Sequence, residues 1–587
     1  MVISMVRRII LEMVLLNYKI KILDFIKKYW LEILSLLIMS LLVLINLNVR
    51  YFAADEGYNV TMGQYILRNN WIPKVWDGRN IITTINGNDF NNNFILTNLN
   101  WGAYYLSALA QLLFGHSEYF IRLPFALFGI FSSLIWYKYF IYKTNDKNIS
   151  KIFLVIYCLS ISIIIYSRNA NYFSPSLFFM GLMYLYNYKS IHQKKRIHTA
   201  LYIIFCFIQF HVNYMLFLFT FIPLLFEILI EKKVTKIFLF KNILVTLITL
   251  PFFIWMRYNF DIYNSNYRNI TLIPFKTGYI RFLEQFWHLN YFIAPIFILL
   301  FIKISIDFLY KKKKKIPIDD GILSNFKNLK IIIHWHWLFS IFFNLIFLTF
   351  FTLEYETRYY LAIFPFLFIS VAYIINNIYK KDKIISFIIL GLILFSNIIN
   401  MIPFQIAHII NKDEKNSFIK YIIQEPVPSA YKEDYNLNSY FLRYVSHYTK
   451  NYVDEVHALV SYLNENAKND DVINVGVIDP WVNSIQYYSD LRLVNNLRLN
   501  FGSWANDKDY YNAERYYNLV SYPDEKVDWV IYTDNPEVVN IMNLYMNNDE
   551  YEKIYIDKTL SGMQNDIWLY SFESLKSPKK IMIFKKK

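Results

Sequence analysis

Long apolar runs constrain this chain more than any other feature. An α-helix needs about 20 mostly apolar residues to cross a hydrocarbon core roughly 30 Å thick, and "LEILSLLIMSLLVLINLNVR" at 31–50 fits that requirement. Such runs lie near 31–48, 119–142, 152–166, 173–188, 198–210, 213–231, 237–256, 289–310, 334–352, 358–379 and 383–403. With 56% hydrophobic and 18% charged residues, the sequence predicts a polytopic α-helical membrane protein of about 11 transmembrane helices.

The distribution of charge argues against nucleic acid as a partner. The net charge is +15, yet residues 404–587 carry 20 Lys and Arg against 26 Asp and Glu. The positive excess therefore lies in residues 1–403, where basic side chains flank the apolar runs as they do in cytoplasmic loops. We expect no nucleic-acid binding.

The same basic residues predict the orientation of the chain. If the N-terminus, with Arg7, Arg8, Lys27 and Lys28, is cytoplasmic, the first run ends on the outer side. No small-residue cleavage site follows that run, so we expect a retained helix. The lysine-rich turns further along all fall inside only if the short stretch at 100–115 does not cross, which predicts a juxtamembrane helix there. The outer side would then hold the first outer loop at 50–118, the segments 166–172, 257–288 and 353–358, and everything after 403.

The polar end of the chain predicts a separate domain. Helix-period segments such as "VDEVHALVSYLNENA" alternate with short apolar runs at 472–478 and 527–533. This alternation is typical of an α/β fold. We therefore divide the chain into a transmembrane domain at 1–403 and an extracytoplasmic α/β domain at 404–587. The two cysteines, Cys158 and Cys206, lie inside apolar runs, where we expect small core residues.

Two acids follow the first apolar run directly. Asp55 and Glu56 sit where the chain has just left the membrane, in a loop far longer than the usual connection between packed elements. A carboxylate near the lipid boundary is costly to keep dry, so its presence indicates either a hydrated helix end or a functional group. The loop continues through "GYNVTMGQYILRNNWIP", which has the apolar spacing of an amphipathic helix lying on the membrane.

Five segments carry a resemblance to a known family. They read "ADEGYNVTMGQYILRNNWIP", "WGAYYLSALAQLLFGHSEYFIRLPFALFGI", "YSRNANYFSPSLFF", "ETRYYLAIFPFLF" and "ALVSYLNENAKNDDVINVGVIDPWVNSIQYYSD". In this order they resemble the polyprenyl-phosphate-sugar-dependent glycosyltransferases of the GT-C superfamily, which include lipid A aminoarabinose transferases and protein O-mannosyltransferases. One departure lies before the juxtamembrane helix, where the family often has Lys-Pro, His-Pro or Pro-Pro and this chain has Asn98 and Asn100 around Leu99.

The resemblance implies roles for individual residues. Asp55 would be the catalytic base, or the carboxylate that orients the acceptor or a metal, with Glu56 as a second catalytic or anchoring acid. A cation must stabilise a departing phosphate, and the outer segments hold the candidate donor phosphate-binding residues Arg358, Arg168, Arg257, Arg268 and Arg281. Tyr172, Asn98, Asn100 and His211 would line the substrate cavity, while Glu118 and Arg122 would form a structural salt bridge.

The function that these features imply is glycosyl transfer. A polyprenyl-phosphate sugar would be the donor, and an extracytoplasmic lipid, glycan or protein would be the acceptor. No metal site and no certain cofactor are assigned, and a divalent cation remains an alternative. A polytopic transporter or lipid flippase is the alternative function, although such proteins usually show repeat symmetry and short outer loops. A non-catalytic scaffold is a third alternative, which predicts that replacing Asp55 is harmless.

Overall fold

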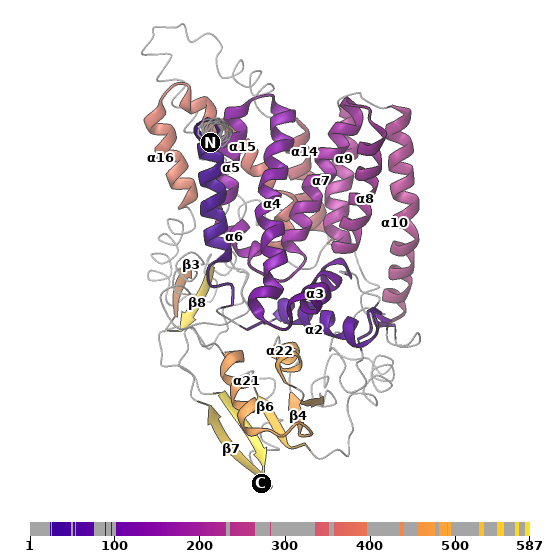
Figure 1. Ribbon diagram of the computed structural model, residues 1–587, viewed down its shortest axis with the longest axis vertical. Coiled ribbons are helices and arrows are strands. Elements are labelled where there is room, and N and C mark those ends of the chain that lie inside the picture. The colour runs from indigo at the N-terminus through magenta and orange to yellow at the C-terminus, as the bar shows by residue number, and fades with distance from the viewer. Residues whose placement is uncertain are drawn as a thin grey trace, which may run out of the picture.

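The fold was analysed in a computed structural model of the chain. The structure describes residues 24, 26–48, 51–52, 54–75, 88–89, 95–96, 101–230, 235–263, 282, 335–351, 357–395, 435–439, 455–475, 481–489, 491–494, 527–532, 549–556, 570–574 and 581–587. In some helix and strand segments only the backbone is described. Three layers follow one another along the long axis: a helix bundle, a pair of crosswise helices and a C-terminal sheet (Figure 1).

Helices occupy ten of the eleven predicted apolar runs. They are a helix at 26–44, α4 (Glu118–Thr144), α5 (Lys147–Leu159) with α6 (Ile161–Ser167), α7 (Phe173–His192), α8 (Arg196–Val212), α9 (Tyr214–Ile230), α10 (Lys236–Tyr263), α14 (Trp335–Phe351), η3 (Thr357–Ala362) with α15 (Phe364–Tyr379), and α16 (Lys383–Leu394). The run at 289–310 lies outside the described residues. The chain is thus an integral membrane protein with a predominantly helical membrane part.

Length and composition support the membrane assignment for part of the bundle. Among the described residues, Glu118–Thr144, Lys236–Trp255 and Tyr360–Tyr379 are long and apolar enough to cross a membrane. The pair α5 and α6 passes the same test as one span bent by 58°. The total of about 11 crossings stays a prediction.

The core of the bundle is strongly aromatic. Trp136 on α4 packs against Tyr184 on α7 and Phe366 on α15, with ring centroids 5.4 and 5.6 Å apart. The two cysteines, Cys158 on α5 and Cys206 on α8, are buried and unbridged. Their prediction as small core residues is confirmed.

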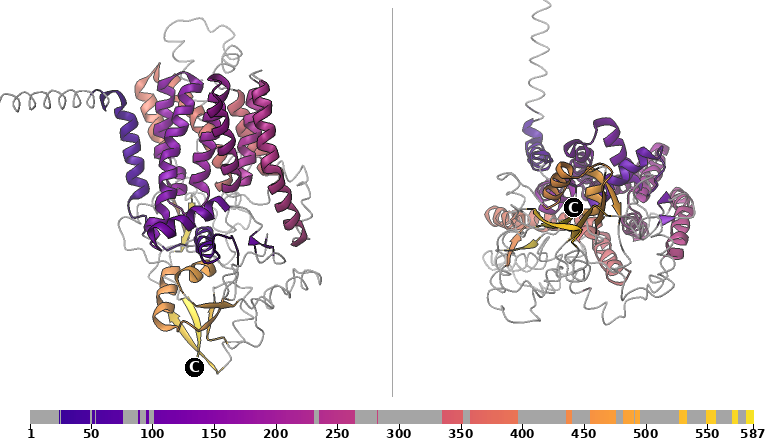
Figure 2. Two further views of the ribbon diagram at one scale, coloured as in Figure 1. Left: turned by 45° about the vertical axis from the view of Figure 1, so that its right-hand side comes forward. Right: turned by 90° about the horizontal axis from the view of Figure 1, so that it is seen from below.

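Two helices of the first loop lie across the end of the bundle. They are α2 (Ala54–Arg68) and α3 (Trp101–Phe114), which pack on each other and run transverse to the bundle axis (Figures 1 and 2). Their shared core contains Met62 and Ile66 from α2 with Tyr104 and Ala108 from α3. At 14 residues, α3 would be only about 21 Å long at 1.5 Å per residue. It forms the short helix predicted at 100–115 and does not run along the bundle.

A five-stranded mixed sheet lies beyond these helices. Its strand order is β5 (Arg492–Val494), β4 (Val472–Val475), β6 (Trp529–Tyr532), β9 (Ile581–Lys586) and β7 (Tyr551–Ile556). The first three strands are parallel, and β9 is antiparallel to both of its neighbours. Within the apolar runs at 472–478 and 527–533, the described residues Val472–Val475 and Trp529–Tyr532 form the adjacent strands β4 and β6 of this sheet. The parallel neighbours β4 and β5 are consecutive in sequence, and the helix at Trp481–Tyr488 connects them.

Helices α21 (Glu455–Asn466) and α22 (Trp481–Tyr488) complete the C-terminal layer. Leu459 and Leu463 of α21 share a core with Ile485 of α22 and with Ile473 and Trp529 of the sheet. Two further two-stranded sheets pair β1 (Asn88–Asp89) with β2 (Ile95–Leu96) and β3 (Tyr435–Ser439) with β8 (Tyr570–Ser574). The α/β character of this part agrees with the prediction, while the division at residues 403 and 404 stays a prediction because both residues lie outside the described ranges.

Candidate active site

The two acids begin a helix and face different surroundings. Asp55 and Glu56 occupy the first turn of α2, where negative charge is favoured by the helix dipole. Consecutive helical residues point about 100° apart because a turn holds 3.6 residues. The side chain of Asp55 is exposed, whereas that of Glu56 is 2% exposed. The neighbouring acids are therefore suited to different tasks.

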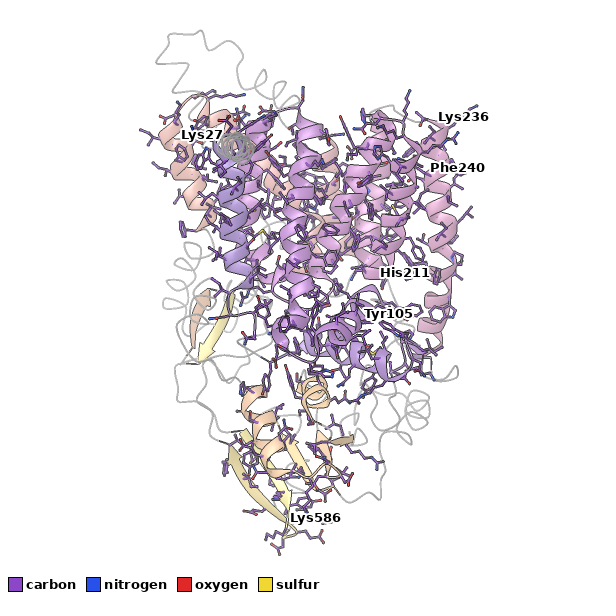
Figure 3. The ribbon with its side chains drawn as sticks, viewed as in Figure 1. Lys27, Tyr105, His211, Lys236, Phe240 and Lys586 are labelled. Atoms are coloured by element: carbon purple, nitrogen blue, oxygen red, sulfur yellow. The ribbon has the colours of Figure 1, made fainter. Side chains whose placement is uncertain are left out.

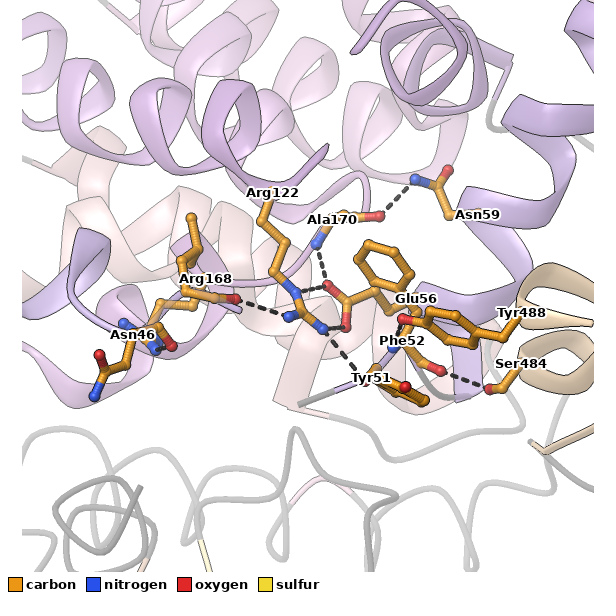
Figure 4. A network of polar contacts seen from close by, with 11 residues as sticks. Asn46, Tyr51, Phe52, Glu56, Asn59, Arg122, Arg168, Ala170, Ser484 and Tyr488 are labelled. Carbon is orange, nitrogen blue, oxygen red and sulfur yellow. Dashed lines mark hydrogen bonds and ion pairs between the residues drawn. The ribbon is translucent and has the colours of Figure 1, made fainter. Parts of the chain in front are cut away.

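Glu56 is the centre of a buried polar network (Figure 4). Nε of Arg122 donates to Oε1 of Glu56 at 2.7 Å, and Nη2 donates to Oε2 at 2.8 Å. The backbone N–H of Ala170 also donates to Oε1, at 2.7 Å. Both side chains are almost fully buried, so each charge depends on the other for the compensation that water would otherwise give. Glu56 therefore anchors the start of α2.

Arg122 extends this network to the end of the first helix. Its Nη1 donates to the Leu47 carbonyl at 2.8 Å, and Nη2 donates to the Tyr51 carbonyl at 3.3 Å. The guanidinium also lies over the ring of Phe52, 4.6 Å from its centroid, a favourable cation–π geometry. The sequence predicted a salt bridge between Glu118 and Arg122, whereas the structure pairs Arg122 with Glu56. Glu118, at the start of α4, is half-buried and contributes to the electrostatic field at Arg122.

Of the five predicted phosphate-binding arginines, Arg168 is the one whose side chain the structure describes. Arg168, 9% exposed, donates to the carbonyls of Leu42, Val43, Ile45 and Asn46 at 2.7–3.1 Å. Leu42 and Val43 lie in the last turn of the helix at 26–44, and Ile45 and Asn46 lie in the turn after it. Carbonyls at the C-terminal end of a helix lack intrahelical partners, and a basic side chain can satisfy them. The contacts favour a helix-capping role for Arg168.

The structure describes no side chain for six other residues that the sequence predicted for the site. Arg358 in η3 and Arg257 in α10 have a described backbone only. Arg268, Arg281, Asn98 and Asn100 lie outside the described residues. The structure therefore leaves their roles as predictions.

Tyr172 and His211 sit at the same end of the bundle. Tyr172 is 6% exposed and precedes α7, with its ring 4.6 Å from that of Phe173. His211, near the end of α8, has its ring 6.2 Å from that of Trp101 and 5.0 Å from that of Phe252. Its Nε2 is buried without a hydrogen-bond partner among the described residues.

The residues that the sequence did not single out come from the C-terminal layer. The hydroxyl of Ser484 on α22 donates to the Phe52 carbonyl at 2.6 Å, and the phenol oxygen of Tyr488 accepts from the Phe52 N–H at 2.9 Å. Burial and the nearby carboxylate of Glu118 raise the pKa of Tyr488 well above its ordinary value, so the phenol stays neutral. Nothing in the segment "WVNSIQYY" indicates a contact with a peptide more than 400 positions earlier.

The described residues contain no gathered metal-ligand set. No group of three His, Cys, Asp or Glu side chains lies within reach of a single ion there. Of the two neighbouring acids, Glu56 already holds Arg122 with both oxygens.

Fold and site together define an integral membrane protein with a helix bundle and a C-terminal sheet. The candidate site lies between them, at the acidic turn, which is the first turn of α2 with Asp55 and Glu56. No protein-family model and no curated protein match the chain. Among solved structures, ArnT from Cupriavidus metallidurans bound to undecaprenyl phosphate matches with a TM-score of 0.50 and 10% sequence identity, over 95% of this chain and 98% of ArnT. The likeness shows that this chain has the GT-C fold.

Two further structures give lower scores. ArnT from the same organism in the apo state matches with a TM-score of 0.48 and 11% identity, over 90% of this chain and 92% of that chain. AglB, an archaeal oligosaccharyltransferase from Archaeoglobus fulgidus in complex with an inhibitory peptide and a dolichol-phosphate, matches with a TM-score of 0.42 and 10% identity. That match covers 86% of this chain and 69% of AglB.

Proposed function

We propose that the protein is an inverting glycosyltransferase that moves a sugar from a polyprenyl-phosphate carrier to an acceptor outside the cytoplasm. The carrying observation is the contrast between the two acids at the start of α2. Glu56 is locked in a buried ion pair, while Asp55 is held one residue away with an exposed side chain. A rigidly placed and accessible carboxylate is what activation of an acceptor requires.

The proposed reaction assigns Asp55 the proton of the acceptor. As an acceptor hydroxyl or amine attacks the anomeric carbon, a new bond forms there and the bond between that carbon and the phosphate oxygen breaks. Asp55 takes the acceptor proton, and polyprenyl phosphate leaves with the electron pair. The attack comes from the face opposite the phosphate, so the configuration at the anomeric carbon inverts.

A cation must meet the charge that develops on the phosphate. We assign this role first to Arg358, because Arg168 already caps four carbonyls. Arginine suits it since the planar guanidinium can hold two phosphate oxygens at once. Arg257, Arg268 and Arg281 are further candidates. The crystal structure of ArnT from Cupriavidus metallidurans holds undecaprenyl phosphate, which supports a donor of this class for the present chain.

The orientation proposed from the basic residues agrees with the arrangement of the layers. Lys27 and Lys236 lie at one end of the bundle, and Lys586 lies at the opposite end of the molecule (Figure 3). Lysines concentrate on the cytoplasmic side of membrane proteins. We therefore place α2, α3 and the C-terminal sheet outside the cytoplasm, in the cell membrane, where lipid-linked sugars are the available donors.

Replacement of Asp55 tests the proposed function. In purified protein supplied with a polyprenyl-phosphate sugar in nanodiscs, Asp55→Asn should lower turnover by roughly a thousandfold or more, because a positioned base contributes several kcal/mol to transition-state stabilisation. The matched control is Glu552→Gln, which removes an exposed acid from β7 at the far side of the sheet. Turnover of Asp55→Asn within a few-fold of the parent enzyme would rule out the assignment.

A further inference from the structure

The two residues before the acidic turn are held by the C-terminal layer. Tyr51 and Phe52 belong to no helix or strand, yet both hydrogen-bonding groups of the Phe52 backbone are occupied by α22. The Phe52 N–H donates to the phenol oxygen of Tyr488 at 2.9 Å, and its carbonyl accepts from Ser484 at 2.6 Å (Figure 4). Because both bonds come from one short rigid helix, they fix the position and the direction of this peptide.

The side chain of Tyr51 is fixed by the same layer. Its ring stacks on His457 of α21 at 4.2 Å with an interplanar angle of 11°, and on Tyr488 of α22 at 4.1 Å with an angle of 21°. The ring therefore lies between two elements of the C-terminal layer. Phe52 adds an edge-on contact with Tyr487, with ring centroids 5.3 Å apart. Aromatic pairs in these arrangements contribute beyond the area that they bury.

The packing of α2 on α22 depends on a residue without a side chain. A Cβ built on Gly57 would lie 3.1 Å from Oγ of Ser484 and 3.6 Å from its backbone nitrogen. Gly57 follows Glu56 directly and therefore brings the first turn of α2 against α22. A second contact links the neighbouring turn, because the phenol of Tyr487 donates to the His116 carbonyl at 3.3 Å.

The first turn of α2, which carries Asp55 and Glu56, is held between Arg122 and α22 (Figure 4). The Arg122 network holds Glu56 from within the bundle, while α22 holds Phe52, three residues before Asp55, from the C-terminal layer. A side chain at the first turn of a helix takes its direction from the peptides that enter the helix. Displacements of about 1 Å in such positions can cost a hundredfold in rate.

We propose that α22 is a positioning element of the active site: Ser484 and Tyr488 fix the Phe52 peptide and thereby set the direction of the Asp55 carboxylate. This inference rests on the proposed function, since it assigns Asp55 a reacting partner. Ser484 and Tyr488 are positioning residues that touch neither substrate. The C-terminal layer is accordingly part of the catalytic unit.

The test compares Ser484→Ala and Tyr488→Phe with the parent in the donor-supplied assay. Each removes one partner of the Phe52 peptide, and Tyr488→Phe keeps the ring that stacks on Tyr51. We expect kcat to fall roughly ten- to a hundredfold, with donor affinity within about threefold of the parent since no substrate contact is removed. Tyr555→Phe is the control, because it removes an exposed phenol from β7 of the same layer.

A merely structural role is distinguished by a double-mutant comparison. In the Asp55→Glu background the carboxylate remains but is already displaced, so Ser484→Ala should cause a much smaller further loss than in the parent. Equal losses in both backgrounds would mean that Ser484 supports the fold alone. If Ser484→Ala does not fold, Tyr488→Phe carries the test, and full turnover of that variant overturns the proposal.

Amide exchange gives a readout that does not depend on the assay. Tyr488→Phe should accelerate hydrogen exchange at the Phe52 amide, because that N–H loses its acceptor. Unchanged exchange would overturn the positioning role. The two proposals also fail in different ways: an active Asp55→Asn removes the proposed function, whereas an inactive Asp55→Asn beside a fully active Tyr488→Phe removes the role of α22 only.

Discussion

At the scale of residues, the adjacent acids have different roles: Glu56 anchors α2, and Asp55 is the proposed reacting carboxylate. The sequence marks both, because both follow an apolar run, but it contains no signal that pairs Glu56 with Arg122, 66 positions later. The pairing depends on α4 returning beside the start of α2. A sequence motif can therefore identify the pair of acids, while only the packing shows which of the two is buried.

Breaking the buried ion pair between Glu56 and Arg122 should lower the stability of the protein, whatever its effect on activity. Glu56→Gln leaves the Arg122 charge buried with neutral partners only, and breaking such a pair typically costs about 3–5 kcal/mol. The apparent unfolding temperature in nanodiscs should fall markedly. Glu552→Gln is the matched control, because it removes an exposed acid from β7 and should leave the unfolding temperature close to that of the parent. Equal unfolding temperatures for Glu56→Gln and the parent would show that the network does not anchor α2.

Arg358 is the residue on which the donor proposal depends most. Arg358→Ala should weaken binding of the polyprenyl-phosphate sugar and lower turnover, and Arg358→Lys should restore only part of both, because an ammonium cannot hold two phosphate oxygens in the same way. Lipid-phosphate binding to purified variants at matched salt is the measurement. Arg196→Ala serves as the control, because Arg196 is exposed and lies at the start of α8, at the other end of that helix from His211.

Lys in place of Leu99 should partly rescue the Arg358→Ala variant, because it restores a cation from the loop side. Unchanged affinity and turnover of Arg358→Ala would move the search for the donor site to Arg168 or to the segment 257–288.

At the scale of elements, the apolar runs predicted helices well but not their internal breaks. The run at 152–166 is continuous in sequence, yet it folds as α5 and α6 with a bend of 58° at Ser160. No proline or glycine marks this bend. The bend accompanies a close approach of α6 to α4, where a Cβ built on Gly129 would lie 2.1 Å from Oγ of Ser167. A contact of this kind is invisible to hydrophobic patterns.

Gly129 therefore gives a prediction about how α4 and α6 pack. Gly129→Ala forces the two helices apart or displaces Ser167, and overpacking of this kind typically costs about 1–3 kcal/mol. Turnover should fall as well, because Arg168 follows Ser167 directly and Ala170, whose N–H donates to Glu56, lies three residues after Ser167. The control is Gly391→Ala on α16, where an added Cβ meets nothing within 4 Å and the helix gains up to about 1 kcal/mol in propensity. Similar unfolding temperatures for the two variants would contradict the prediction.

At the scale of the whole molecule, the apolar runs predicted the helical membrane part, while the division at residues 403 and 404 stays a prediction. The alternation of helix-period and apolar segments also indicated the α/β character of the C-terminal layer. Sequence could not supply the strand order, in which β9 lies between β6 and β7. Nor could it supply the contact of Ser484 with Phe52, because pairings over such separations follow from tertiary packing and leave no local period.

Thiol labelling of intact cells tests the orientation of the whole molecule. Glu552→Cys on β7 should react with an impermeant thiol reagent added outside, and Lys195→Cys, in the turn between α7 and α8, should not. Both positions are exposed, and the native Cys158 and Cys206 are buried, so they should give little background. The reverse pattern of labelling would place α2, α3 and the sheet on the cytoplasmic side and remove the basis for a lipid-linked donor.

The bond between Ser484 and Phe52 also imposes an order on biosynthesis. Its two ends are 432 residues apart, so a ribosome working at about 5–20 residues per second needs roughly 20–90 s to make the second after the first. During that interval the first turn of α2 can cross the membrane and Glu56 can pair with Arg122, but the Phe52 peptide has no partner from α22. We expect the nascent chain to remain without transferase activity until α22 has been synthesised, moved across the membrane and docked, which delays catalysis until the bundle has formed.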